Sequence, residues 1–108
     1  MSASRLEQIS GAQCRAARAL TDISRSMLAE RSGIAEDAIR AFERKLAEVD
    51  RGDNEALRQA LEHLGAQFID DDTHGGRGVR LKFNTTESAR IERLENEGGQ
   101  ASDDDVAP

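Results

Sequence analysis

Residues 23–43 constrain the fold most, because they hold two short apolar patterns of helical spacing separated by one glycine. Met27, Leu28 and Ala29 form the apolar side of the first segment. Ile39 and Phe42, three residues apart, form that of the second. Gly33 lies between the segments, and glycine readily adopts the left-handed backbone that ends a helix. The pattern therefore predicts two short helices joined by a tight turn.

Polar residues mark the starts of these helices and of an earlier one. Ser10, with Gln13 three residues later, predicts a capping box for a helix over 11–21. Ser24 is a favourable N-cap for a helix that ends near Ser32. The next helix begins after Ala35, which lacks a capping side chain. The acidic residues that follow it are expected to compensate through the helix dipole.

The end of this third helix is harder to predict. Ile39, Phe42, Leu46 and Val49 keep helical spacing, and no glycine or proline intervenes before Gly52. The spacing favours a helix that continues toward Val49.

A fourth helix is expected to begin at Asp50 or Asp53. Leu57, Ala60, Leu61 and Leu64 give this helix an apolar stripe. Gly65 is expected to end it.

After Gly65 the apolar period changes from that of a helix to that of a strand. Two alternating runs flank a turn-rich segment, so residues 66–84 are expected to form a β-hairpin or two strands that pair with another chain. Such strands are marginal alone, which makes this extension a candidate dimer element. The apolar dimer candidates are Phe68, Val79, Leu81 and Phe83.

The predicted fold class is mainly α, a four- to five-helix domain followed by a short β-hairpin. Residues 1–9 are expected to form an N-terminal tail, 10–65 the helical domain and 85–97 a possible C-terminal helix. Residues 98–108 are acidic with little to bury, and we expect them to be disordered.

The charge distribution limits non-specific attraction to nucleic acid. The net charge is −6, but residues 1–65 hold 10 Lys/Arg and 11 Asp/Glu, whereas residues 66–108 hold 5 and 10. Most of the net negative charge therefore lies outside the helical domain.

The single cysteine, Cys14, fits a reducing cytoplasm, and no apolar run or leader pattern suggests a membrane location.

Two helices joined at a glycine are typical of a helix-turn-helix, whose second helix enters the DNA major groove. Four segments in order resemble the Cro/phage-repressor class of helix-turn-helix proteins (the XRE family). These segments are Ala12-Gln-Cys-Arg-Ala-Ala-Arg-Ala-Leu20, Leu28–Gly33, Ile39-Arg-Ala-Phe-Glu43, and residues 60–70 with 78–81. The resemblance implies a lambda-repressor-like domain, DNA binding and transcription regulation.

The resemblance also implies roles for individual residues. Arg18 and Glu43 match a structural pair of the family, and the alternative is an ordinary surface ion pair. Base contacts would come from Glu36, Asp37, Ala38, Arg40 and Ala41. Phosphate contacts would come from Arg25, Ser26, Arg44 and Lys45. For Glu36 and Asp37, base contact and helix-dipole stabilisation are equally weighted alternatives.

The sequence departs from the family in two places, of which the second, a loop without basic residues, weakens the expected affinity for DNA. Thr21-Asp22-Ile23 replaces a glycine turn, and Leu46-Ala-Glu-Val-Asp50 replaces a basic loop. Two hypotheses follow: a homodimeric, sequence-specific regulator of double-stranded DNA, or a protein-interaction module of the same fold that binds another regulator.

No motif points to an enzyme. Asp70, Asp71, Asp72 and His74 fit no metal-ligand spacing and are interpreted as turn residues. His63 is assigned to surface packing and Cys14 to the core. The glycine cluster at 75–78 lacks a phosphate-loop context, so no metal or cofactor is expected.

Overall fold

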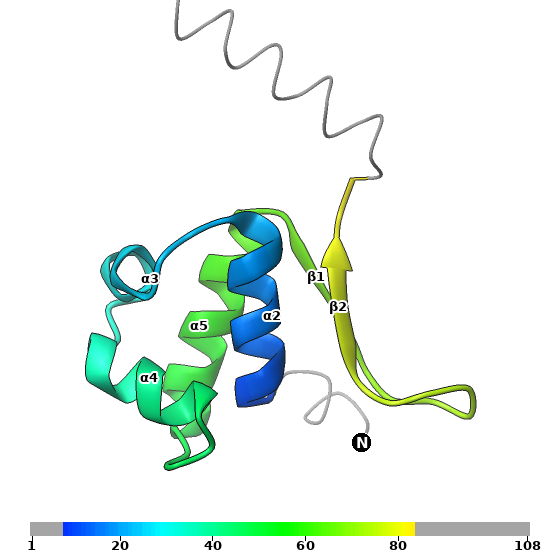
Figure 1. The fold of residues 1–108 in the computed structure, drawn as a ribbon, viewed down its shortest axis with the longest axis horizontal. Coiled ribbons are helices and arrows are strands. Elements are labelled where there is room, and N and C mark those ends of the chain that lie inside the picture. Colours follow the sequence, from blue (N-terminus) through cyan, green and yellow to red (C-terminus); the bar gives the residue numbers. More distant parts are fainter. Residues whose placement is uncertain (1–7, 84–108) are drawn as a thin grey trace, which may run out of the picture.

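The computed structural model describes residues 8–83, in which four helices precede a two-stranded antiparallel hairpin (Figure 1). The elements are α2 (Gly11–Thr21), α3 (Arg25–Ser32), α4 (Glu36–Glu43), α5 (Arg51–His63), β1 (Ala66–Ile69) and β2 (Gly78–Leu81). This confirms the expected mainly α class with a short hairpin. The helix predicted over 85–97 and the tail at 98–108 lie outside the described residues, as do residues 1–7.

Helices α2 and α5 lie side by side in the middle of the molecule (Figure 1). Helices α3 and α4 pack on one side of this pair, and the hairpin packs on the other. The buried apolar core is shared by all of these layers: Ile9, Cys14, Ala17, Leu28, Ile39, Phe42, Leu57, Leu61 and Ala66. Burial of a leucine or phenylalanine side chain of this kind stabilises a fold by about 1.5–3 kcal/mol.

Helix α2 begins and ends as the sequence predicts. The Ser10 side chain accepts a hydrogen bond from the Gln13 backbone, and the Gln13 side chain accepts one from the Ser10 backbone. Asp22 ends the helix in the left-handed region at φ 60°. Gly11 is needed in the first turn, because a Cβ there would lie 2.0 Å from the Phe42 carbonyl oxygen.

Helix α4 ends earlier than predicted, and the continued helix toward Val49 is wrong. The chain leaves the helix after Glu43, and Lys45 adopts φ 62° although it is not a glycine. The Leu46 backbone N–H then donates to the Ala41 carbonyl, which satisfies an end carbonyl of the helix. Leu46 is consequently 75% exposed rather than part of an apolar stripe.

Asp50, one of the two predicted starts, is the N-cap of α5, and its side chain accepts from the Asp53 backbone. Gly65 has φ 110° and follows the end of that helix, as expected. Ile9, in the segment expected to be an N-terminal tail, is only 4% exposed. Its backbone N–H and carbonyl both bond the side chain of Asn54, so the ordered domain begins before Ser10.

The hairpin is covered by helices of its own chain. In the register, Ala66 pairs with Leu81 and Phe68 with Val79. Phe68 and Val79 pack against the core. The Gln13 side-chain nitrogen donates to the carbonyls of Gly78 at 2.8 Å and Ile69 at 3.3 Å, which ties the two strands to α2.

Candidate nucleic-acid interface

Helices α3 and α4 form a pair joined by residues 33–35, and their ends have different chemistry. Ser24 caps α3 by accepting from the Met27 backbone, and Gly33 ends it with φ 79°. Ala35 precedes α4 without a side-chain hydrogen bond. The first turn of α4 instead carries two acidic residues, whose charges are favourable beside the positive end of the helix dipole.

The carboxylate of Glu43, at the end of α4, connects three helices. Arg18 of α2 donates from Nε to Glu43 Oε2 at 2.7 Å and from Nη2 to Oε1 at 2.8 Å. Arg25 of α3 donates from Nε to Oε1 at 3.1 Å. Cys14 of α2 donates from Sγ to Oε2 at 3.3 Å. We call these four residues the Glu43 cluster. The predicted contact between Arg18 and Glu43 is confirmed, and the surface-pair alternative is wrong because the Glu43 side chain is fully buried.

The ionisation of the cluster follows from its geometry. Burial alone would raise the pKa of the Glu43 carboxyl, but hydrogen bonds from Arg18, Arg25 and Cys14 outweigh burial and hold the pKa below its ordinary value. The hydrogen bonds to Glu43 raise the pKa of Arg18. Burial, together with the Glu43 carboxylate, raises the pKa of the Cys14 thiol far above its ordinary value. The cluster is therefore a carboxylate held by two cations and a neutral thiol.

The five candidate base-contact residues all lie on α4, three at its start and Arg40 and Ala41 in its second half. Glu36 and Asp37 are exposed, whereas Ala38, Arg40 and Ala41 are half-buried. Arg40 donates from Nη1 to Asp37 Oδ1 at 2.6 Å, and the Asp37 side chain is 91% exposed. One guanidinium nitrogen of Arg40 is thus occupied by an acidic neighbour that is also a candidate base contact.

The candidate phosphate-contact residues fall into two groups. Ser26 is exposed on the first turn of α3, while Arg25 beside it is 25% exposed and bonded to Glu43. Arg44 and Lys45 are exposed just after α4. Sequence reasoning did not foresee the Glu43 contacts of Arg25 and Cys14, because residues from separate helices leave no spacing signal.

The dimer candidates are only partly available for association. Phe68 and Val79 are half-buried and pack against the core of their own chain, and their role in a dimer stays a prediction. Leu81 is half-buried. Phe83 is 40% exposed, and Ile69, on the outer side of β1, is 37% exposed.

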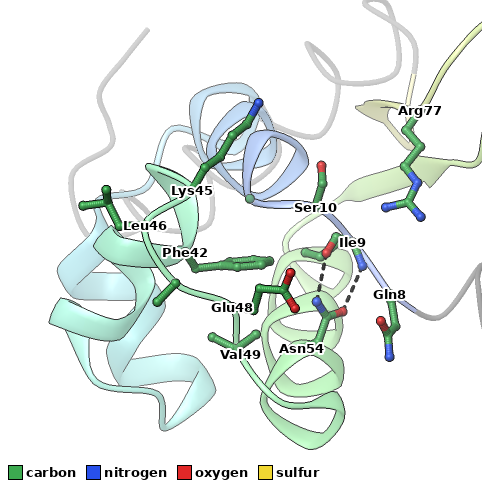
Figure 2. A pocket seen from close by; sticks show the side chains of 12 residues that line it. Gln8, Ile9, Ser10, Phe42, Lys45, Leu46, Glu48, Val49, Asn54 and Arg77 are labelled. Atoms are coloured by element: carbon green, nitrogen blue, oxygen red, sulfur yellow. Dashed lines mark hydrogen bonds between the residues drawn. The ribbon is translucent and has the colours of Figure 1, made fainter.

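A groove of about 640 Å³ lies beside the end of α4 (Figure 2). The Phe42 ring lies between the segment that carries Ile9 and the loop that carries Val49, and the two hydrogen bonds between Asn54 and Ile9 lie beside it (Figure 2). Lys45 and Leu46 lie at one edge, and Arg77 lies at the other (Figure 2). The loop after α4, residues 46–50, therefore places the exposed side chain of Leu46 beside a partly apolar groove.

The remaining polar residues give no further site within the described range. Asp72 accepts hydrogen bonds from the backbones of His74 and Gly75, as turn residues do, and His63 is exposed on α5. Residues 8–83 contain no group of three or more His, Cys, Asp or Glu arranged to hold a metal ion. In the same range, no helix has both the length and the apolar character needed to cross a membrane. No protein-family model matches the sequence, and a search of curated proteins found no match either.

Proposed function

We propose that the chain is a DNA-binding transcription regulator of the helix-turn-helix type, in which α3 and α4 are the two helices of the motif. The observation that carries this proposal is the Glu43 cluster, which fixes the end of α4 to α2 and α3 while Glu36 and Asp37 stay exposed at its start. A helix held in this way can enter a major groove without losing its orientation. The resemblance to the Cro/phage-repressor class supports the same function.

In this function α4 reads base edges. Arg40 is suited to guanine O6 and N7, and Glu36 or Asp37 to cytosine N4. Ser26, Arg44 and Lys45 lie exposed before and after this surface, where phosphates flank a groove-bound helix. We further propose that the regulator acts in the cytoplasm as a homodimer, so that two copies of α4 meet successive major grooves.

Enrichment of duplex DNA from a random library, with the full-length protein, tests this proposal. We expect one family of duplexes to emerge and to bind more tightly than scrambled duplexes at every salt concentration. Arg40→Ala should remove the preference, while Arg31→Ala, an exposed arginine at the end of α3, should keep it. A library that stays random after several rounds contradicts the proposal.

A second candidate, binding to another transcription regulator, is favoured by one observation. Leu46 is 75% exposed beside the groove, where a phosphate-binding loop would carry basic residues. An exposed leucine next to a partly apolar groove suits a protein contact better than a phosphate. A regulator captured by the wild type and by Arg40→Ala, but not by Leu46→Ser, is the expected result for this candidate.

A further inference from the structure

The two arginines of the Glu43 cluster use their nitrogens differently. Arg18 uses all three, because Nε and Nη2 donate to Glu43 and Nη1 donates to the Ile23 carbonyl at 3.2 Å. Arg25 uses only Nε for its bond to Glu43. Among residues 8–83, neither Nη1 nor Nη2 of Arg25 donates a side-chain hydrogen bond to a protein group. All three guanidinium nitrogens of Arg18 therefore bond within the domain, whereas only one nitrogen of Arg25 does.

Glu43 has no acceptor capacity left. A carboxylate offers about four lone-pair sites. Oε2 accepts from Arg18 and Cys14, and Oε1 accepts from Arg18 and Arg25. Because the Glu43 side chain is fully buried, these four donors fix its position. The bond from Arg25 Nε then anchors a guanidinium whose other two nitrogens have no side-chain hydrogen-bond partner among residues 8–83.

Arg25 is the first residue of α3, directly before exposed Ser26 and on the helix that packs against α4. Its side chain is 25% exposed, so it is partly open to solvent. We infer that Glu43 positions Arg25 so that one guanidinium connects the buried carboxylate to a backbone phosphate of bound duplex DNA. This inference rests on the proposed function, and it makes Glu43 a positioning residue for a phosphate contact.

The chemistry of the guanidinium suits this double role. Its N–H groups diverge in one plane, so Nε can bond one anion while Nη1 and Nη2 bond another. A lysine carries the same charge on a single nitrogen and cannot hold both anions in that geometry. A phosphodiester is favoured over a peptide carboxylate because Ser26 and the basic residues after α4 supply further neutral or positive contacts for a polyanion.

The test compares Arg25→Lys with Arg25→Ala in the full chain, using the duplex enriched by the wild type. Both variants should weaken binding about tenfold, the loss expected for one charge-assisted hydrogen-bonded contact. Arg25→Ala should also reduce the slope of log K against log salt by about 0.9, the value for one phosphate, whereas Arg25→Lys keeps its charge and should reduce it less. Arg31→Lys, on the same helix and exposed, is the matched control and should change neither quantity.

Glu43→Gln supplies a second measurement. In that background, Arg25→Ala should weaken binding less than about threefold, because an unpositioned guanidinium contributes less. An equal loss in both backgrounds overturns the positioning role. If Glu43→Gln does not fold, the lysine variant still decides, because Arg25→Lys that binds like the wild type shows that charge alone suffices.

Two further outcomes separate this inference from the proposed function. A wild type that enriches no duplex overturns both. A wild type that enriches a duplex, while Arg25→Ala binds it with unchanged affinity and salt slope, overturns this inference alone. Loss of a protein partner in Arg25→Lys with unchanged DNA binding would assign the two nitrogens to a peptide carboxylate and overturn it as well.

Discussion

The two ends of α4 are held by opposite means. At its C-terminal end, Glu43 is fully buried and accepts four hydrogen bonds from two other helices. At its N-terminal end, Ala35 offers no side-chain cap, and Glu36 and Asp37 are exposed. The contrast teaches that the buried polar contacts of this helix lie at one end, while Ile39 and Phe42 hold it to the core through apolar packing. The other end keeps its polar groups available for a partner.

Breaking the Glu43 cluster, at the C-terminal end of α4, should have the largest effect on stability. Arg18→Ala removes two hydrogen bonds from a buried carboxylate and should lower the free energy of unfolding by about 3 kcal/mol. Arg15→Ala, an exposed arginine on the same helix, is the matched control and should have little effect. Urea unfolding followed by circular dichroism measures both. Equal midpoints for the two variants would show that the cluster does not stabilise the fold.

Acid should remove the contribution of Glu43 to the stability of the fold. Because the pKa of Glu43 is lowered in the folded state, its contribution is complete above the unfolded value of about 4.3 and is lost as pH falls through the folded pKa. The stability difference between the wild type and Glu43→Gln should therefore shrink as the pH falls below about 5. Thermal unfolding as the pH is lowered tests it, with Glu30→Gln, at an exposed position on α3, as the charge-matched control. A constant difference contradicts the prediction.

A capping side chain at Ala35, before the first turn of α4, should increase the stability of the fold. Ala35→Thr places a hydroxyl where an N-cap oxygen accepts from the backbone of the first turn. It should exceed the stability of the isosteric Ala35→Val by about 1 kcal/mol. Chemical denaturation of the pair separates the cap from the added volume. Identical midpoints would mean that the acidic first turn already satisfies this end.

The smallest effect on stability is expected at Arg40. Its bond to Asp37 is exposed, and such pairs contribute about 0–1 kcal/mol. Arg40→Ala should therefore leave the melting temperature nearly unchanged while it alters duplex preference. A large drop in melting temperature would show that Arg40 stabilises the fold, as the Glu43 cluster does, and would weaken its assignment as a base contact.

The sequence predicted features whose physical cause is local. The Ser10 capping box, the Gly33 turn and the stripe of α5 each depend on residues within a few positions, and each was found. The resemblance supplied the Arg18–Glu43 contact, which spans 25 residues.

Features that depend on tertiary contacts were missed. The end of α4 depends on the left-handed backbone of Lys45, a conformation that the sequence does not predict for a lysine. The cover of the hairpin relies on Gln13 and on the faces of α2 and α5, which alternation within a strand cannot specify. The extra donors to Glu43 come from helices whose packing had to be known first.

Gln13 links two parts of the chain that lie more than fifty residues apart, because one side-chain amide serves both the helix start and the hairpin. Opening the hairpin would release the amide nitrogen, and fraying of the helix would release the amide oxygen. The first turn of α2 and the paired strands should thus exchange their backbone hydrogens as one cooperative unit, slower than either alone. The hairpin is in this way tied to the helix that supplies Arg18 and Cys14.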